Sequence, residues 1–180
     1  VTVLHSPRLL PVNAEIKNGT IRDQLDEYTF LTTRPNSHLA FNKIDMTGVK
    51  QLSIVPNWHL YNIYKGGKIE IRLDSPTGEL IGETEMIPEQ FNTRYRGAFG
   101  GLPENEINKD VIKNYPPLNE AKFFAPGADK NSFTIPSYAI LKDVIGYHDV
   151  YFVFKNGQVK SEESLFPLAW IEFCNEIKKD

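Results

Sequence analysis

The clearest pattern of hydrophobic and polar positions runs from Gly66 to Met86. Ile69, Ile71 and Leu73 alternate with charged residues, and a period of two places one face of a strand against a core and the other toward water. The next five residues, 74–78, read Asp-Ser-Pro-Thr-Gly, a turn composition, because proline fixes φ and glycine accepts a positive φ. A second extended run follows, so the pattern predicts a β-hairpin with a longer loop.

Short extended runs of the same kind recur along the chain. They lie at 21–33, 38–44, 49–55, 132–141, 148–154 and 165–173, with turns at 34–37, 45–48 and 155–157. The run 148–154 is almost wholly apolar, as a strand buried on both faces would be. Roughly eight or nine short strands with little helix predict an all-β fold, a two-sheet β-sandwich of jelly-roll type.

Residues 88–130 break this pattern and are predicted to form a long insertion. The segment is rich in proline and glycine, and only 104–114 has helical spacing, with acidic residues early and a lysine late, as the helix dipole favours. A loop of this length inside a compact domain is usually functional or mobile. We therefore expect an insertion with one short helix.

Length and charge narrow the classes of protein. A chain of 180 residues with 41% hydrophobic and 24% charged residues suits a single globular domain, residues 1–180. The net charge of −3 argues against nucleic acid as a partner, since such binders carry a basic face. No apolar run reaches the ~20 residues of a membrane helix. The start at Val1 lacks the pattern of a signal peptide and suggests a processed protein or a piece of a longer one.

The sequence holds no recognisable catalytic or metal-binding motif, so we predict that this domain is not an enzyme. A single cysteine, Cys174, forms no internal disulfide, and the histidines show no metal-ligand spacing. His148 and Asp149 are neighbours on a strand, so their side chains point to opposite faces. A glycosidase needs two carboxylates that face each other across a cleft, and nothing in the sequence places any two of these candidates so: Glu70, Asp74 and Glu83.

Aromatic residues gather between Pro56 and Lys65, which is predicted to be a loop. Sugar binding needs flat aromatic faces for pyranose rings and planar polar groups for hydroxyls. The candidate carbohydrate-binding residues from this loop and from the start of the insertion are Trp58, His59, Tyr61, Tyr64, Asn92 and Tyr95. The alternative is structural. Trp58 and Tyr61 would then plug the end of the sandwich, and the segment 91–96 would be packed insertion with solvated arginines.

Three stretches together resemble the family-six carbohydrate-binding modules: 66–78, 146–154 and 165–173. The resemblance covers about residues 36–86 and 132–173. It implies a galactose-binding-like jelly roll that is non-catalytic and attached to secreted carbohydrate-active enzymes. Similar modules also lie at the carboxyl end of large extracytoplasmic bacterial proteins that contain sugar dehydrogenase or cytochrome c domains. The resemblance therefore implies an extracytoplasmic location, whether periplasmic, cell-surface or secreted, in a larger bacterial protein.

Two positions depart from that family. Pro167 stands where such modules usually have an asparagine that hydrogen-bonds sugar, and proline has no side-chain donor or acceptor. Ala169 stands where they have an aspartate that helps to hold a structural calcium, an ion that needs several oxygen ligands. Glu15 matches the family's amino-terminal calcium glutamate. The resemblance thus leaves a structural calcium at Glu15 as an open alternative, with no other cofactor implied.

These observations lead to one main hypothesis and two alternatives. The main hypothesis is a non-catalytic module that binds an oligo- or polysaccharide and is tethered to its parent protein. The first alternative is a degenerate sandwich of the same fold that docks to neighbouring domains without binding sugar. Pro167, Ala169 and the insertion favour this alternative. The second, weaker alternative is a hydrolase.

Overall fold

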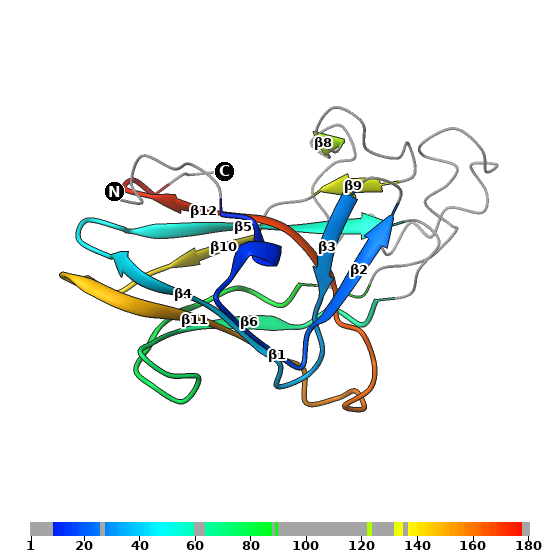
Figure 1. The fold of residues 1–180 in the computed structure, drawn as a ribbon. Coiled ribbons are helices and arrows are strands. Elements are labelled where there is room, and N and C mark those ends of the chain that lie inside the picture. The colour runs from blue at the N-terminus through cyan, green and yellow to red at the C-terminus, as the bar shows by residue number, and fades with distance from the viewer. Residues whose placement is uncertain are drawn as a thin grey trace.

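Strands make up almost all of the regular structure in the computed structural model (Figure 1). The structure describes residues 9–25, 28–59, 64–87, 89, 122–123, 132–134 and 137–177. The elements in these ranges are η2 (Pro11–Asn13), β1 (Ile16–Asn18), β2 (Ile21–Leu25), β3 (Tyr28–Thr32), β4 (His38–Asp45), β5 (Gln51–His59), β6 (Lys68–Leu73), β7 (Leu80–Glu83), β8 (Lys122–Phe123), β9 (Ser132–Thr134), β10 (Ser137–Ile140), β11 (Tyr147–Lys155) and β12 (Pro167–Cys174).

The strands form two antiparallel sheets stacked face to face (Figure 1). One is five-stranded, in the order β1-β4-β11-β6-β7. The other is seven-stranded, in the order β2-β3-β12-β5-β9-β8, with β10 pairing with the first half of β5. This arrangement confirms the all-β, two-sheet sandwich that the sequence predicts.

The hairpin predicted over 66–86 is confirmed as β6 and β7. Ile71 pairs with Gly82, and Ile69, Ile71 and Leu73 are buried while the residues between them are half-buried. The turn is closed by hydrogen bonds from Leu73 N–H to the Glu79 carbonyl (3.0 Å) and from Gly78 N–H to the Ser75 carbonyl (3.1 Å). The alternating pattern therefore gave the right strand and the right face.

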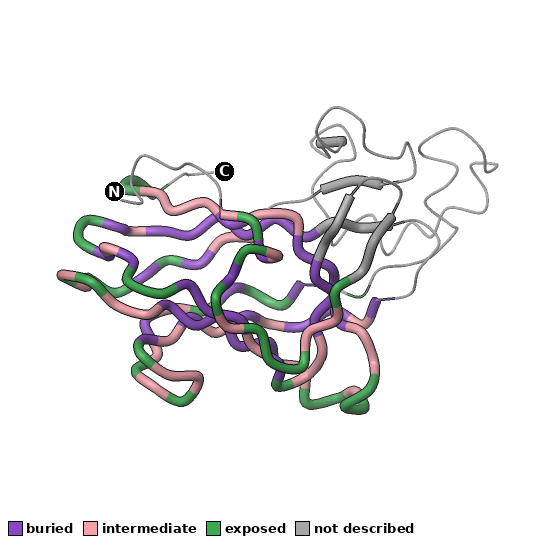
Figure 2. The backbone as a smooth tube through the Cα atoms, in the orientation of Figure 1, coloured by how far each residue is buried: buried purple, intermediate pink, exposed green. Residues whose placement is uncertain are grey.

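Strand β11 lies in the middle of the five-stranded sheet and is buried on both faces, as predicted. Val150, Phe152 and Phe154 have no exposed surface and belong to the core between the sheets. Tyr151 and Val153 face the other way and form a small apolar cluster on the outer face of this sheet. Figure 2 shows the buried positions continuing along the strands of both sheets. Burial on both faces explains why this run carries no alternation.

Several sequence predictions are wrong in detail. The single run expected over 21–33 is two paired strands, β2 and β3. The loop expected from Pro56 begins later, because β5 continues through His59. The run predicted over 38–44 is not a regular strand throughout, because Lys43 sits at a bulge with φ +53° and is exposed. The described residues hold twelve strands rather than eight or nine.

The predicted insertion lies largely outside the described residues. Within 88–130 the structure describes only Glu89 and strand β8, so the helix expected over 104–114 lies outside the described part. Among the described residues, no helix has the length and apolar character needed to cross a membrane.

Candidate functional site

The predicted aromatic site lies at one end of the sandwich, where β5 finishes. Trp58 pairs with Phe133 and His59 with Ser132 on β9. For this part of β5 the structure describes the backbone alone. Three further candidates lie outside the described residues: Tyr61, Asn92 and Tyr95. The structure thus shows which strand carries Trp58 and His59, and their role in binding stays a prediction.

Tyr64 needs a correction, because its side chain is 3% exposed and belongs to the core. The next residues are drawn toward the loop before β12, since Lys65 N–H donates to the Ser164 carbonyl and Gly66 N–H to the Leu165 carbonyl, both at 2.9 Å. A ring in this position offers no free face to a sugar. Tyr64 is therefore a core residue, and the structural alternative, which named Trp58 and Tyr61, stays a prediction.

The two departures from the family pattern lie at the start of β12. Pro167 is buried and pairs with Thr32 of β3. Ala169 is half-buried at an irregularity in the pairing, where the register with β5 shifts between Leu168 and Trp170. Neither side chain therefore offers a hydrogen-bonding group at the start of β12.

The Glu15 carboxylate is hydrogen-bonded to the backbone of β4. Its Oε2 accepts a hydrogen bond from the Asn42 backbone N–H at 3.3 Å, on the exposed side of β4. Within the described residues, no three side chains of the His, Cys, Asp or Glu type gather as a metal site. Among the described residues, Glu15 therefore belongs to no such cluster, and a calcium site at this residue stays a prediction.

The outer face of the five-stranded sheet carries a mixed polar and aromatic patch that the sequence analysis did not single out. Tyr151 pairs with Ala40 on one side and Arg72 on the other. Its ring centroid lies 5.8 Å from that of His38, tilted by 50°, and burial lowers the pKa of His38. Arg72 donates from Nε to Glu70 at 2.9 Å and from Nη1 to the Gly78 carbonyl at 2.7 Å.

The Tyr151 ring is 8% exposed, so the groups of this outer-face patch that a saccharide could reach are the planar charged groups fixed by hydrogen bonds. The Arg72 and Glu70 side chains are 23% and 19% exposed. The sequence shows that Glu70 and Arg72 alternate with core residues and so lie on the outer face. It does not show that Tyr151 lies beside them, because Tyr151 belongs to a strand about eighty positions away.

A second polar cluster lies at the sandwich end opposite Trp58. The ring nitrogen Nδ1 of His148 lies 3.0 Å from Asp74 Oδ2, and Asp149 N–H donates to Asp74 Oδ1 at 3.1 Å. Lys43 N–H in turn donates to Asp149 Oδ1 at 2.9 Å. These bonds tie the ends of β4, β6 and β11 together. The partner of His148 is therefore Asp74, and the neighbour Asp149 serves the backbone of β4.

The hydrogen bond between His148 and Asp74 shifts the pKa of both groups. The bond to Asp74 raises the pKa of His148 above its usual 6.5, and the same bond lowers the pKa of Asp74 below its usual 3.8. A raised histidine pKa adds stability below 6.5 that is lost as pH rises through the folded-state pKa. A lowered aspartate pKa adds stability above 3.8 that is lost as pH falls through its folded-state pKa. The pair stabilises the fold most between these limits.

Replacing His148 by glutamine is expected to destabilise the protein most near pH 5.5 and least near pH 9. The loss should be about 0.2–1 kcal/mol, because the pair is exposed enough for water to screen it. Urea unfolding at pH 5.5, 7 and 9 measures the difference from wild type. His38→Gln is the matched control and should show the opposite trend, since a lowered histidine pKa adds stability that is lost as pH falls. A pH-independent effect of His148→Gln would contradict the assignment.

Comparisons with known proteins show which fold the chain shares. No protein-family model matches the chain, and no curated protein matches it. A family 6 carbohydrate-binding module from Clostridium cellulolyticum, solved with xylose, is similar at a TM-score of 0.57 and 21% identity, over 93% of this chain and 95% of that chain. The chain has the fold of a family 6 carbohydrate-binding module.

Other solved structures with this fold agree. A β-1,3-glucan binding module of family 6 from Bacillus halodurans matches at a TM-score of 0.56 and 16% identity, over 92% of this chain and 93% of that one. A family 43 arabinoxylan arabinofuranohydrolase from Bacillus subtilis matches at 0.52 and 16% identity, and the match covers 92% of this chain but 26% of the enzyme. The shared fold makes up nearly all of the first two solved chains and about a quarter of the enzyme.

Proposed function

We propose that residues 1–180 form one non-catalytic module that binds an oligo- or polysaccharide outside the cytoplasm. The observation that carries the proposal is the match of nearly the whole chain to nearly the whole of known carbohydrate-binding modules. The fold alone does not define a function, so the proposal also rests on the side chains. Tethered to a carbohydrate-active or sugar-oxidising parent protein, such a module raises the effective concentration of the parent at its polymer.

The proposed binding residues are Trp58 and His59 at the end of β5, together with Tyr61, Asn92 and Tyr95, which lie outside the described residues. An aromatic face stacks on the C–H face of a pyranose ring and an amide orients its hydroxyls. The outer-face patch around Tyr151 and Arg72 is a second surface with suitable chemistry.

The competing proposal is a sandwich that docks to its parent protein without binding sugar. Pro167 supports it, because this position is buried against β3 and has no side-chain donor or acceptor. Ala169 supports it too, because it removes a carboxylate from the same strand. Sugar binding by the isolated chain separates the two proposals.

The Trp58→Ala variant is expected to weaken binding of soluble xylo-, cello- or β-1,3-gluco-oligosaccharides at least about tenfold, since central aromatic contacts dominate such sites. A glycan array selects the ligand and titration calorimetry measures the dissociation constant. Tyr147→Ala is the matched control, because Tyr147 is 67% exposed and lies at the other end of the sandwich. It should leave the affinity unchanged.

Intrinsic fluorescence supplies a second readout, since the chain has two tryptophans, Trp58 and Trp170. In a Trp170→Phe variant the signal comes from Trp58 alone, and a saturable shift with sugar would support contact at that residue. Absence of binding both on the array and in calorimetry would overturn the proposal and favour the docking module. Binding that survives Trp58→Ala but is lost in Arg72→Ala would move the site to the outer face of the five-stranded sheet.

A further inference from the structure

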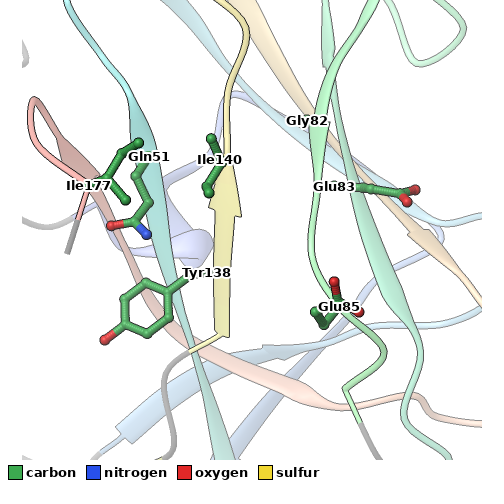
Figure 3. A pocket seen from close by; sticks show the side chains of 7 residues that line it. All are labelled: Gln51, Gly82, Glu83, Glu85, Tyr138, Ile140 and Ile177. Carbon is green, nitrogen blue, oxygen red and sulfur yellow. The ribbon is translucent and has the colours of Figure 1, made fainter. Parts of the chain in front are cut away.

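A pocket lies between the edge of β10 and the edge of β7, where the two sheets come together (Figure 3). Its volume is about 510 Å³, within the range of about 300–1,000 Å³ typical of small-molecule sites. In Figure 3, one wall carries Gln51, Tyr138, Ile140 and Ile177, and the opposite wall carries Gly82, Glu83 and Glu85. The pocket belongs to neither surface considered above.

The backbone closes one end of this pocket. Lys142 N–H donates to the Ile81 carbonyl at 2.8 Å, which links the chain after β10 to β7. A side chain at Gly82 would place its Cβ 2.7 Å from the Ile140 carbonyl oxygen, so glycine allows this close approach. Tyr138 and Glu85 lie farther from this link along their chains, on facing walls of the pocket.

The first wall is apolar, with one amide. Ile140 and Ile177 are 60% and 49% exposed, unusual for large aliphatic side chains that lie beside each other on a pocket wall. Tyr138 is half-buried, so part of its ring surface is accessible. Gln51 is 2% exposed at the base of the same wall. The exposed isoleucines of this wall suit the apolar face of a ring.

The second wall is acidic, and no cation is among the lining residues. Glu83 bonds Lys68 Nζ at 3.2 Å and, in Figure 3, points away from the Tyr138 wall. Glu85 is exposed and, among the residues that the structure describes, has no ion-pair partner. Among the described residues, a ligand here therefore meets the Glu85 carboxylate on one wall and apolar side chains on the other. A carboxylate without a cationic partner attracts an ammonium group and repels acidic or sulfated sugars.

We propose that this pocket binds a saccharide unit that carries a free amino group, as in a glucosamine polymer. The apolar wall takes the ring face, and Glu85 accepts hydrogen bonds from the ammonium group. The inference rests on the proposed carbohydrate-binding function and adds a sugar class and a second site. Gln51 and Trp58 are seven positions apart on β5, about 23 Å at a rise of about 3.3 Å per residue. The two sites can therefore be tested independently.

The test is titration calorimetry of the full chain with a β-1,4-linked glucosamine tetramer and with its N-acetylated counterpart. The glucosamine tetramer should bind and the acetylated one should bind at least about tenfold more weakly, because acetylation removes the charge. Glu85→Gln should weaken the tetramer about tenfold or more, and Tyr138→Leu should weaken it while keeping apolar volume. Glu162→Gln removes the same charge from an exposed loop outside the pocket and should change nothing.

Each outcome is decisive. Equal binding of the two tetramers, or binding indifferent to Glu85→Gln, would overturn the pocket assignment. Competition by a lysine-rich peptide at the same concentration would overturn it in favour of a peptide groove. If neutral oligosaccharides bind through Trp58 while the glucosamine tetramer does not bind, the pocket assignment fails and the proposed function stands. If no glycan of any kind binds, both fail.

Discussion

Replacing Phe152 by alanine is expected to lower the free energy of unfolding by about 3–5 kcal/mol. Phe152 has no exposed surface and sits in the middle of β11, the central strand of its sheet. Its ring meets that of Phe41 edge to face, with centroids 6.2 Å apart and planes at 86°. Replacing the ring by a methyl group removes buried apolar surface and this aromatic contact. It also leaves a cavity between the two sheets, because hydrogen bonds to β4 and β6 hold β11 in place.

Urea unfolding followed by circular dichroism measures this loss, and Tyr147→Ala provides the control. Tyr147 belongs to the same strand but is 67% exposed, so its replacement should change stability by no more than about 0.5 kcal/mol. If Phe152→Ala does not fold, Phe152→Leu should show a smaller loss that can still be measured. A loss below about 1 kcal/mol for Phe152→Ala would mean that β11 is not the centre of the core.

The position of β11 illustrates how far the sequence could lead. An apolar run without alternation indicates burial on both faces, and that much was predicted. The neighbours of the strand are not predicted, because β11 pairs with residues of β6 and β4 that lie 77 (Val150 and Leu73) to 115 (Val153 and His38) positions earlier in the chain. Strand order depends on packing between distant segments, and no local pattern records it.

The end of β5 shows why a local rule failed. Proline usually ends a strand because it lacks an N–H for the ladder, so the sequence predicts a loop from Pro56. In the structure Pro56 pairs with Leu168, directly beside the register shift between Leu168 and Trp170 in β12. An irregular place in a sheet tolerates proline, and the strand therefore continues to Trp58 and His59.

The candidate sites likewise combine features that the sequence predicts with features that only the fold creates. The cluster of aromatic residues after Pro56 was visible in the sequence, but the burial of Tyr64 depends on backbone bonds to the loop before β12. The pocket between β10 and β7 had no sequence signal at all. Its facing walls come from Glu85, Tyr138 and Ile177, residues that only the folding of both sheets brings together.

Replacing Gly78 by alanine is expected to cost about 3 kcal/mol, the upper end of the usual range for an atom added where there is no room. A Cβ at Gly78 would lie 1.9 Å from the Leu73 carbonyl oxygen, so the turn would have to open. The turn is held by the bond between Leu73 and Glu79 and by the bond from Arg72 Nη1 to the Gly78 carbonyl at 2.7 Å. Opening it would break these bonds and loosen the hairpin of β6 and β7.

Thermal and urea unfolding measure the effect, and Gly157→Ala is the matched control. Gly157 also lies in a turn, but nothing is within 4 Å of its added Cβ and its φ is not left-handed. Its replacement should be neutral or stabilising by up to about 1 kcal/mol, since alanine restricts the unfolded chain. Equal effects of the two substitutions would show that the turn at 74–78 relaxes freely. A large loss confined to Gly78→Ala would make this hairpin, the strongest pattern in the sequence, a feature on which the sandwich depends.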